Sequence, residues 1–410
     1  MDQDPPLVID PAGADLHAEA ARLRARGPIT RVLLPSGVEA WAVTGYHAAR
    51  RLLADERFAR NARQHWPAYI DGTLDPGFPL MAWARMDNMS TVDGEPHARQ
   101  RRLVAGAFSP QRIATLRPRV ERVVRRALDE LAGHAAEHPG EPVDLKLRYA
   151  HLVSSRVIGE LLGVPDSDPD GVLTRAGYIE PTPEQAAAEY ARLQDKLGAL
   201  VAAKRRDPGE DLISDLIAAQ PPGCPMTGAG SDAELIGLVQ LMLNTGAEPA
   251  RNLITNTVLA LLTRPGQRAL AMAGQVDWGD VVEETLRTDA SVAYLPFRFA
   301  TQDVTIAGVT IRRGEPVLVG YAATGRDPEV HGSAAGEFDA RRADKRHLAF
   351  GYGAHRCVGP ALTRMEVRLA VEALFTRFPG VRLAVEPKEL AGQGTFVMNG
   401  RRELPIHLER

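Results

Sequence analysis

Residues 350–359 read Phe-Gly-Tyr-Gly-Ala-His-Arg-Cys-Val-Gly, and no other segment of this 410-residue chain says as much about its fold. The segment places Cys357 in a glycine-rich bend, directly before a predicted helix at residues 361–370. We expect Gly351, Gly353 and Gly359 to adopt φ values that other residues avoid, so that several backbone N–H groups can point at the sulfur. The positive end of the helix should also lower the pKa of the thiol and hold it as a thiolate.

Four roles are open to such a cysteine. It can be a small buried hydrophobe, a zinc ligand together with His355, a catalytic nucleophile or the axial ligand of a haem iron. The other cysteine, Cys224, lies in a Pro-Pro-Gly-Cys-Pro loop without the partner spacing of a structural zinc site, and no histidine stands out as the base of a nucleophile. We therefore favour axial ligation of haem iron.

The spacing Phe-Gly-x-Gly-x-His-x-Cys-x-Gly closely resembles the haem-binding signature of the cytochromes P450. This resemblance, which covers essentially the whole chain, implies a mainly α fold with a small β lobe. It implies haem b (iron protoporphyrin IX) buried between a long central helix and the cysteine-loop helix, with Cys357 on the iron and Phe350 and Gly351 in the haem loop. The implied activity is that of a soluble, bacterial haem-thiolate monooxygenase.

Composition and charge agree with such an enzyme. The 49 basic and 52 acidic residues nearly balance, so nothing points to a nucleic-acid partner. The two cysteines form no disulfide framework, which favours a cytoplasmic location. The first residues carry neither a basic start nor an apolar run, so we expect no signal peptide and no membrane anchor. We expect residues 1–410 to form a single domain and a monomer.

The sequence pattern divides the chain into a β-rich lobe, mainly 25–50, 290–320 and 380–410, and a helical body, mainly 95–290 and 355–378. Strand patterns at 29–34 and 40–43 flank a turn, and residues 304–311 form a second predicted hairpin. Short strands are also expected at 381–385 and 404–408. Helices are predicted after Pro118 and over residues 152–162. A helix that is apolar nearly all round is predicted from Ser231 to Leu262, and such a helix is buried.

Several charged residues match positions of the P450 pattern. Asp280 is the expected cap of a helix carrying Glu284 and Arg287, which share a helix face. The resemblance implies that this pair binds Arg342 in a buried structural network. It also implies that the haem carboxylates bind a set of four residues, His97, Arg101, Arg298 and His355.

The central helix departs from the P450 pattern Ala/Gly-Gly-x-Asp/Glu-Thr, because its run is Thr245-Gly246-Ala247-Glu248-Pro249. Pro249 replaces the threonine that normally helps deliver protons to oxygen, while Glu248 remains as a candidate proton relay or salt-bridging acid, with Thr245 and Asn244 beside it. A proline in a helix bends it and disfavours the helical conformation of Glu248. Three reactions stay open: hydroxylation with protons from substrate or water, oxidative coupling or cyclisation of an aromatic peptide-like substrate, and peroxide-driven oxidation. A haem protein that binds a ligand without turning it over is the rival from another class.

By resemblance, the substrate pocket is apolar and partly aromatic, which suits a small or medium hydrophobic molecule. Its expected lining comes from the loop before the His97 helix, the central helix, the segment after Arg287 and the C-terminal turn: Trp83, Met86, Asn88, Met89, Leu243, Gly246, Val292, Ala293, Tyr294, Phe396 and Val397. The chain has no flavin or iron–sulfur segment, so electrons should come from an external ferredoxin and ferredoxin reductase. Candidates for docking the acidic ferredoxin are Arg99, Arg102, Arg112 and Arg356.

Overall fold

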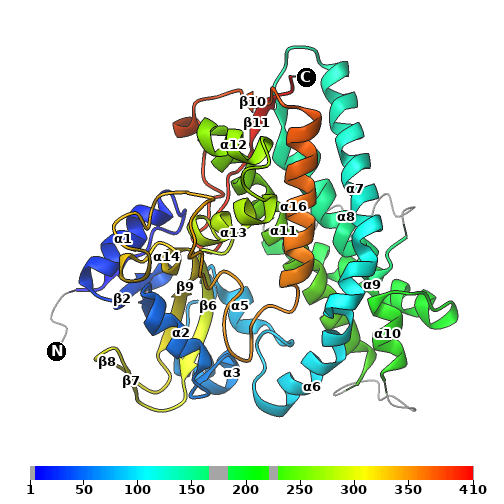
Figure 1. The fold of residues 1–410 in the computed structure, drawn as a ribbon. Helices are drawn as coiled ribbons and strands as arrows, with labels where there is room; N and C mark the ends of the chain where they lie inside the picture. Colours follow the sequence, from blue (N-terminus) through cyan, green and yellow to red (C-terminus); the bar gives the residue numbers. More distant parts are fainter. Residues whose placement is uncertain (1–4, 166–182, 221–229, 410) are drawn as a thin grey trace.

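The computed structural model describes residues 5–165, 183–220 and 230–409, so the loop predicted around Cys224 lies outside the described residues. Helices form the larger body, and most of the strands gather in a lobe on one side of it (Figure 1). The predicted mainly α fold with a small β lobe is confirmed, but residues 382–383 and 405–407, which the sequence pattern placed in that lobe, form a separate sheet on the core of the helical body.

The lobe is built on a six-stranded mixed sheet in which segments far apart in the chain become neighbours. The predicted first hairpin is confirmed, with Ile29 opposite Val43 and Leu34 opposite Val38. Its second strand then pairs in parallel with a strand almost 300 residues later, where Trp41 lies opposite Val317. In sheet order the strands are β1 (Leu7–Val8), β2 (Ile29–Leu34), β3 (Val38–Val43), β9 (Pro316–Gly320), β6 (Tyr294–Ala300) and β4 (Phe58–Ala59).

The remaining strands confirm the other two strand predictions. The hairpin expected at 304–311 forms from β7 (Val304–Ile306) and β8 (Val309–Ile311). The C-terminal strands β10 (Arg382–Leu383) and β11 (Pro405–His407) pair with β5 (Val143–Asp144) in a three-stranded sheet. Shorter helices complete the lobe and the segment that leads into the helical body: α1 (Leu16–Arg26), α2 (Tyr46–Ala54), α3 (Ala62–His65), α4 (Pro67–Ile70), α5 (Met81–Arg85), α14 (Tyr321–Thr324) and α15 (Pro328–His331).

The body is formed by amphipathic helices whose apolar faces meet in one large core. The apolar stripe predicted after Pro118 is buried, but its helix begins earlier, at Pro110, because the Ser109 side chain caps that end and Pro118 is accommodated inside. The helices of the body are α6 (Gly94–Ala105), α7 (Pro110–Glu137), α8 (His151–Leu162), α9 (Pro183–Arg206), α10 (Leu212–Ala218), α11 (Asp232–Leu262), α12 (Pro265–Met272), α13 (Trp278–Thr288) and α16 (Pro360–Arg377).

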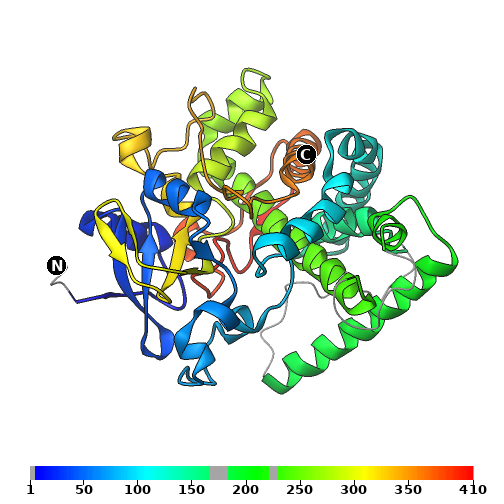
Figure 2. The ribbon, with the colours of Figure 1, turned by 90° about the horizontal axis from the view of Figure 1, so that it is seen from below.

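The long apolar helix predicted at Ser231–Leu262 is α11, capped by the Ser231 side chain. It crosses the middle of the molecule and packs against α8 and α16 (Figure 2). The helix continues through Pro249, so Glu248 stays helical despite the proline that follows it. In the part of the chain that the structure describes, no helix has the length and apolar character needed to cross a membrane.

Candidate active site

The bend before α16 holds Cys357 much as its glycines predicted. Gly351 and Gly353 have φ values of 71° and 73°, in the left-handed region that favours glycine. At Gly353 the backbone also lies directly against α2, since a Cβ there would come within 2.2 Å of the Leu53 carbonyl oxygen. The Cys357 amide donates to the Phe350 carbonyl at 2.8 Å, which closes the bend.

Three expectations about the sulfur and its bend are wrong. One backbone N–H group, that of Gly359, donates to the sulfur at 3.3 Å, whereas several were expected. Gly359 also has an ordinary φ of −102°. Cys357 is solvent-accessible, yet many protein atoms surround its sulfur. Burial therefore raises the pKa of the thiol, outweighing the Gly359 N–H and three nearby arginines, Arg101, Arg356 and Arg364.

Next to this bend the structure brings together basic side chains from distant parts of the chain. The rings of His97, on α6, and His355 lie 4.0 Å apart between centroids. Burial lowers the pKa of His97 and lowers that of His355 to about 3, so both imidazoles are neutral near pH 7. Arg101, one turn after His97 on α6, lies close enough to Cys357 to interact with it electrostatically.

A buried pair of arginines completes this group, and one of them, Arg60, was missed by the sequence analysis. Strand β4 pairs with β6 so that Ala59 lies opposite Phe299; the same register continued by one residue would bring Arg60 opposite Arg298, and the charge of Arg298 does act on Arg60. The two residues are only 5% and 4% exposed. Burial and the charge of Arg298 lower the pKa of Arg60 to about 10. Like charges directly opposite one another in a sheet are destabilising.

The protein supplies little negative charge to offset these arginines. The nearby carboxylate of Asp93 accepts the backbone N–H groups of Arg60 and Asn61, at 2.8 and 3.2 Å, and His355 Nε2 at 3.3 Å. The guanidinium groups reach backbone carbonyls, those of Pro296 from Arg60 and Phe58 from Arg298. The Nε atoms of both arginines are buried without a hydrogen-bond partner.

This donor set fits a ligand that carries carboxylates and an iron. Buried guanidinium donors without partners are costly, and carboxylates would satisfy them bidentately. The accessible sulfur of Cys357 lies within electrostatic reach of Arg101, at the edge of the same cluster. The residues present therefore fit the haem that the sequence resemblance implies.

The network expected to fix this region is present, and its core is fully buried. Glu284 and Arg287 are both 0% exposed and form two hydrogen bonds, at 2.8 and 2.6 Å. Arg342 Nε reaches Glu284 Oε1 at 3.3 Å, as the resemblance implied. The expected cap is wrong: Asp277, rather than Asp280, caps α13 by accepting from the Gly279 N–H, and Asp280 lies in the first turn.

The middle of α11 has an accessible, polar face on an otherwise buried helix. Asn244 and Thr245 are exposed, and Glu248 and Pro249 are partly exposed. The Thr245 hydroxyl donates to the Leu241 carbonyl at 2.7 Å, so its proton is used within the helix. Pro249 places no hydroxyl where the P450 pattern has one.

Glu248 is held by a partly buried polar network that the sequence did not reveal. Gln393 Nε2 donates to Glu248 Oε1 at 2.5 Å, and Arg251 Nη2 lies 3.6 Å from the same oxygen. Lys146 Nζ donates to Gln393 Oε1 at 3.2 Å and to the Arg401 carbonyl. Burial and Arg251 lower the pKa of Lys146 to about 8, which brings this amine close to neutral pH.

The expected pocket residues separate into two groups. Some belong to the core: Leu243 is fully buried, and a Cβ at Gly246 would come within 2.7 Å of Ile158, so this face of α11 packs on α8. Met89 is also buried in that core, while Trp66, from the same segment as Met89, belongs to an aromatic cluster of the lobe.

The segment after Arg287 and the C-terminal turn lie side by side. The amides of Ala293 and Tyr294 donate to the Val397 carbonyl at 2.9 and 3.3 Å, and the rings of Tyr294 and Phe396 lie 6.3 Å apart. Val292 pairs with Met398 in an isolated bridge. Trp83, Met86, Asn88 and Val292 are partly buried. The segment before α6, expected as a loop, instead contains the short helices α3, α4 and α5.

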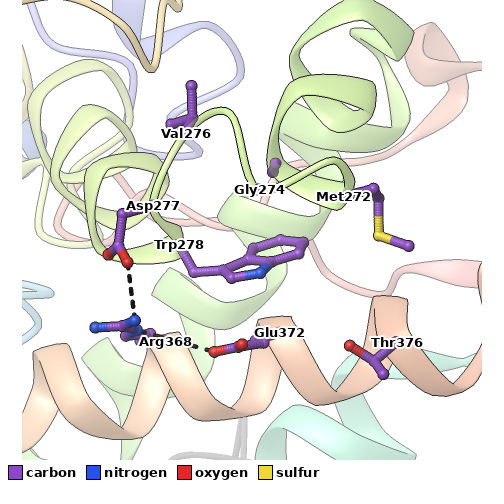
Figure 3. Close-up of a pocket in the computed structure, with 9 residues that line it drawn as sticks. Met272, Gly274, Val276, Asp277, Trp278, Arg368, Glu372 and Thr376 are labelled. Carbon is purple, nitrogen blue, oxygen red and sulfur yellow. Dashed lines mark hydrogen bonds and ion pairs between the residues drawn. The ribbon is translucent and has the colours of Figure 1, made fainter.

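A surface hollow of about 420 Å³ lies elsewhere, between the α12–α13 turn and α16 (Figure 3). Trp278 covers one side, and Arg368 on the other side pairs with Asp277 and Glu372. It contains none of the predicted site residues, so we do not assign it to substrate.

Three of the four arginines proposed to dock a ferredoxin already have acidic partners. Arg99 Nη1 donates to Glu234 Oε2 at 3.0 Å. Arg102 bonds Glu95 at 2.7 Å, and Arg112 lies 3.8 Å from Asp215. Arg356, next to Cys357, is exposed.

Comparison with known proteins identifies relatives along the entire chain. Residues 279–399 match the family model described as Cytochrome P450. The chain is 44% identical over 407 residues to 2-hydroxy-5-methyl-1-naphthoate 7-hydroxylase of Streptomyces carzinostaticus, covering 98% of both proteins. It is 36% identical over 400 residues to the cytochrome P450 monooxygenase PikC of Streptomyces venezuelae, covering 97% of this chain and 92% of PikC.

Solved structures give the same result for the fold. CYP154A1 from Streptomyces coelicolor A3(2) superimposes with a TM-score of 0.86 at 43% identity, covering 98% of this chain and 100% of that one. CYP154C4 from Streptomyces sp. W2061 gives a TM-score of 0.89 at 38% identity, covering 99% and 98%.

Proposed function

The chain belongs to the cytochrome P450 family, and on that basis we propose that it hydroxylates a small or medium hydrophobic molecule in bacterial secondary metabolism. Its relatives are hydroxylases and monooxygenases, so the protein is a P450 oxidoreductase. The 44% identity to a naphthoate hydroxylase favours a fused-ring aromatic substrate. The aromatic side chains of Tyr294, Phe396 and Trp83 are consistent with such a molecule.

Haem b is the proposed cofactor, and its iron would supply the oxygen-activating chemistry when bound to the Cys357 thiolate. The raised pKa of the free thiol does not oppose this role, because a metal deprotonates a thiol that coordinates it. We assign the haem carboxylates to His97, Arg101, Arg298 and His355, and we add Arg60. The support for Arg60 is its buried, unpartnered Nε and the charge of Arg298 that acts on it.

One observation favours oxygen insertion over the alternatives, namely that an acid is retained and held in place although the threonine is lost. Glu248 Oε1 is the proposed proton acceptor and donor on α11. Gln393 orients this carboxylate through a 2.5 Å hydrogen bond. The pKa of Lys146 is lowered to about 8, close enough to neutral pH for this amine to return a proton to Glu248 through the network.

Oxidative coupling or cyclisation is the second candidate, and the specific observation behind it is Pro249 itself. If protons reached oxygen poorly, a reaction that inserts no oxygen would be favoured. A Pro249→Thr variant tests the distinction: we expect a larger fraction of consumed electrons to appear in hydroxylated product if proton delivery is limiting. An unchanged coupling ratio would indicate that the Glu248 network already supplies the protons.

The proposed electron donor is an external ferredoxin with its reductase, docking at the face beneath Cys357. The exposed Arg356 supports this face, while the acidic partners of Arg99, Arg102 and Arg112 reduce their free positive charge. We also propose a single domain, because partly buried Ala349 packs against both the helical core and a core of the lobe, and we propose a monomer as its state. The cytoplasm remains the proposed location, on the basis of cysteine usage.

The decisive experiment is a binding and turnover screen with purified ferric enzyme. Displacement of the iron's water by a substrate shifts the Soret band, so naphthoates, steroids, macrolides and aromatic cyclodipeptides can be compared directly. We expect the largest shift with the hydroxynaphthoate class, followed by a hydroxylated product when a ferredoxin system is added. A shift only with cyclodipeptides, and a coupled product, would favour the second candidate. Binding without any turnover would contradict both and indicate a ligand-binding haem protein.

A further inference from the structure

A cluster of metal-ligating side chains lies at the C-terminal end of α7, in a part of the molecule unrelated to the haem chemistry. His134, Glu137 and His138 occupy positions i, i+3 and i+4, which share one face of a helix. Their ligand atoms all lie within 4.8 Å of one another, and the two imidazole rings are 4.4 Å apart between centroids. The same spacing, His-x-x-Glu-His, is found in inverzincins.

The second histidine is already oriented as a metal ligand would be. His138 Nδ1 lies 2.9 Å from the His134 carbonyl oxygen, to which it can only donate. The Nδ1–H tautomer leaves the lone pair of His138 Nε2 available. Histidines that bind metals usually donate their other ring N–H to such a carbonyl or to a carboxylate, which fixes the ring and raises its basicity. This contact is thus an outer-shell bond present before any ion arrives.

The local electrostatics also favour a cation. α7 ends at Glu137, and His138 is its C-cap, so the cluster lies at the negative end of a helix of 28 residues. Glu137 and Glu141 add negative potential at His134, while Arg148 opposes it.

We propose that His134, Glu137 and His138 form a surface site for a divalent transition-metal ion of the Zn²⁺ class. Two imidazoles and one carboxylate match the ligand preference of Zn²⁺, with bond lengths of about 2.0–2.2 Å reached by small side-chain rotations. Water completes the coordination. The site would join the last turn of α7 to its cap, close to the sheet of β10, β11 and β5 at the end of the molecule where the C-terminus lies (Figure 1).

Zn²⁺ titration of the haem-loaded, tag-free protein tests this proposal by calorimetry at pH 7. A Cys224→Ser background removes the one thiol other than Cys357. We expect saturable binding of one Zn²⁺ per chain. His138→Ala and His134→Ala should each weaken it by roughly ten-fold or more, since even outer-shell partners are worth that much. His47→Ala is the matched control, because His47 is an exposed histidine on a helix and does not belong to this cluster.

A spectroscopic readout separates ligation from an effect on folding. Cu²⁺ bound at the site should show coupling to two nitrogen nuclei in its paramagnetic resonance spectrum, and to one nitrogen in His134→Ala, while the circular dichroism of both proteins is unchanged. Zn²⁺ binding should weaken below about pH 6.5, where histidines acquire protons. Absence of saturation below about 1 mM Zn²⁺, or equal binding by wild type and both histidine variants, would overturn the proposal.

Discussion

Replacing Arg287 by alanine should destabilise this protein more than replacing Arg342, although both arginines bind Glu284. Arg287 is 0% exposed and donates hydrogen bonds to both Glu284 carboxylate oxygens and to three backbone carbonyls, those of Gly325, Ala335 and Glu337. The alanine variant leaves the buried Glu284 carboxylate with only the Asp339 N–H, at 2.9 Å, and the weaker Arg342 contact.

The structure sets the magnitudes of these two losses. Breaking a buried ion pair by removing one partner costs about 3–5 kcal/mol, and the Arg287 variant meets that description. Arg342 is 16% exposed and contacts Glu284 through one atom at 3.3 Å. It also donates to the Ala334 carbonyl at 2.8 Å. Its loss should therefore cost about 1.5–3 kcal/mol, the value of a hydrogen bond to a charged group. Arg341→Ala, at a neighbouring exposed position, is the control and should stay within about 0.5 kcal/mol of wild type.

Equilibrium unfolding in guanidinium chloride measures these free energies, with far-UV circular dichroism for the fold and the Soret band for the haem. The double variant Glu284→Gln/Arg287→Met removes both charges, and we expect it to lose less stability than Arg287→Ala. If Arg287→Ala and Arg342→Ala are equally destabilised, or if the double variant is the least stable of all, the reasoning from a stranded buried charge is refuted.

Three more predictions follow from the site. Arg60→Met should lower the haem-to-protein ratio after purification and yet raise the melting temperature of the haem-free protein, because it removes one of two neighbouring buried cations; a fall in both would contradict the assigned role. Gln393→Leu should lower the coupling of electrons to product and enlarge the solvent isotope effect. Gln393→Glu should show the same two changes, since an ionised glutamate cannot donate a hydrogen bond to Glu248. Unchanged coupling in the Gln393→Leu variant would show that Gln393 takes no part in proton delivery. Burial would raise the pKa of Glu283, but hydrogen bonds from His347 and Arg364 outweigh it and lower the pKa to about 2. Because this folded-state pKa lies below the unfolded value, its contribution to stability is present above about pH 4.5 and is lost as the pH falls toward 2; acid titration of Glu283→Gln should show a shallower loss of stability in that window.

Local signals in the sequence were sufficient for several secondary-structure elements. The first hairpin, α8, α11 and the 304–311 hairpin follow from alternation, from the 3.6-residue period and from caps next to them in the chain. The two errors at helix ends are local as well. Ser109 and Pro110 form a strong N-terminal signal for α7, but Pro118 suggested a later start. At α13, Asp277 caps the helix, and Asp280 does not.

What the sequence could not reveal depends on contacts between distant segments. Arg60 looks like an ordinary surface base until β4 pairs with β6 and brings it within reach of the charge of Arg298. Gln393 has no motif, and its meaning comes only from its contact with Glu248, 145 residues earlier. The pKa of Cys357 was misjudged for the same reason: the motif shows the helix and the glycines but not how much protein surrounds the sulfur.

The parallel pairing of β3 with β9 has a consequence for how the chain is made. Trp41 leaves the ribosome long before its partner Val317. At about 5–20 residues per second, the edge of β3 waits on the order of 15–55 s for its neighbour. During that time the nascent hairpin presents an open row of backbone N–H and C=O groups to other chains. A chaperone that shields this edge during synthesis should therefore raise the yield of folded protein, and slower translation of residues 44–315 should lower it.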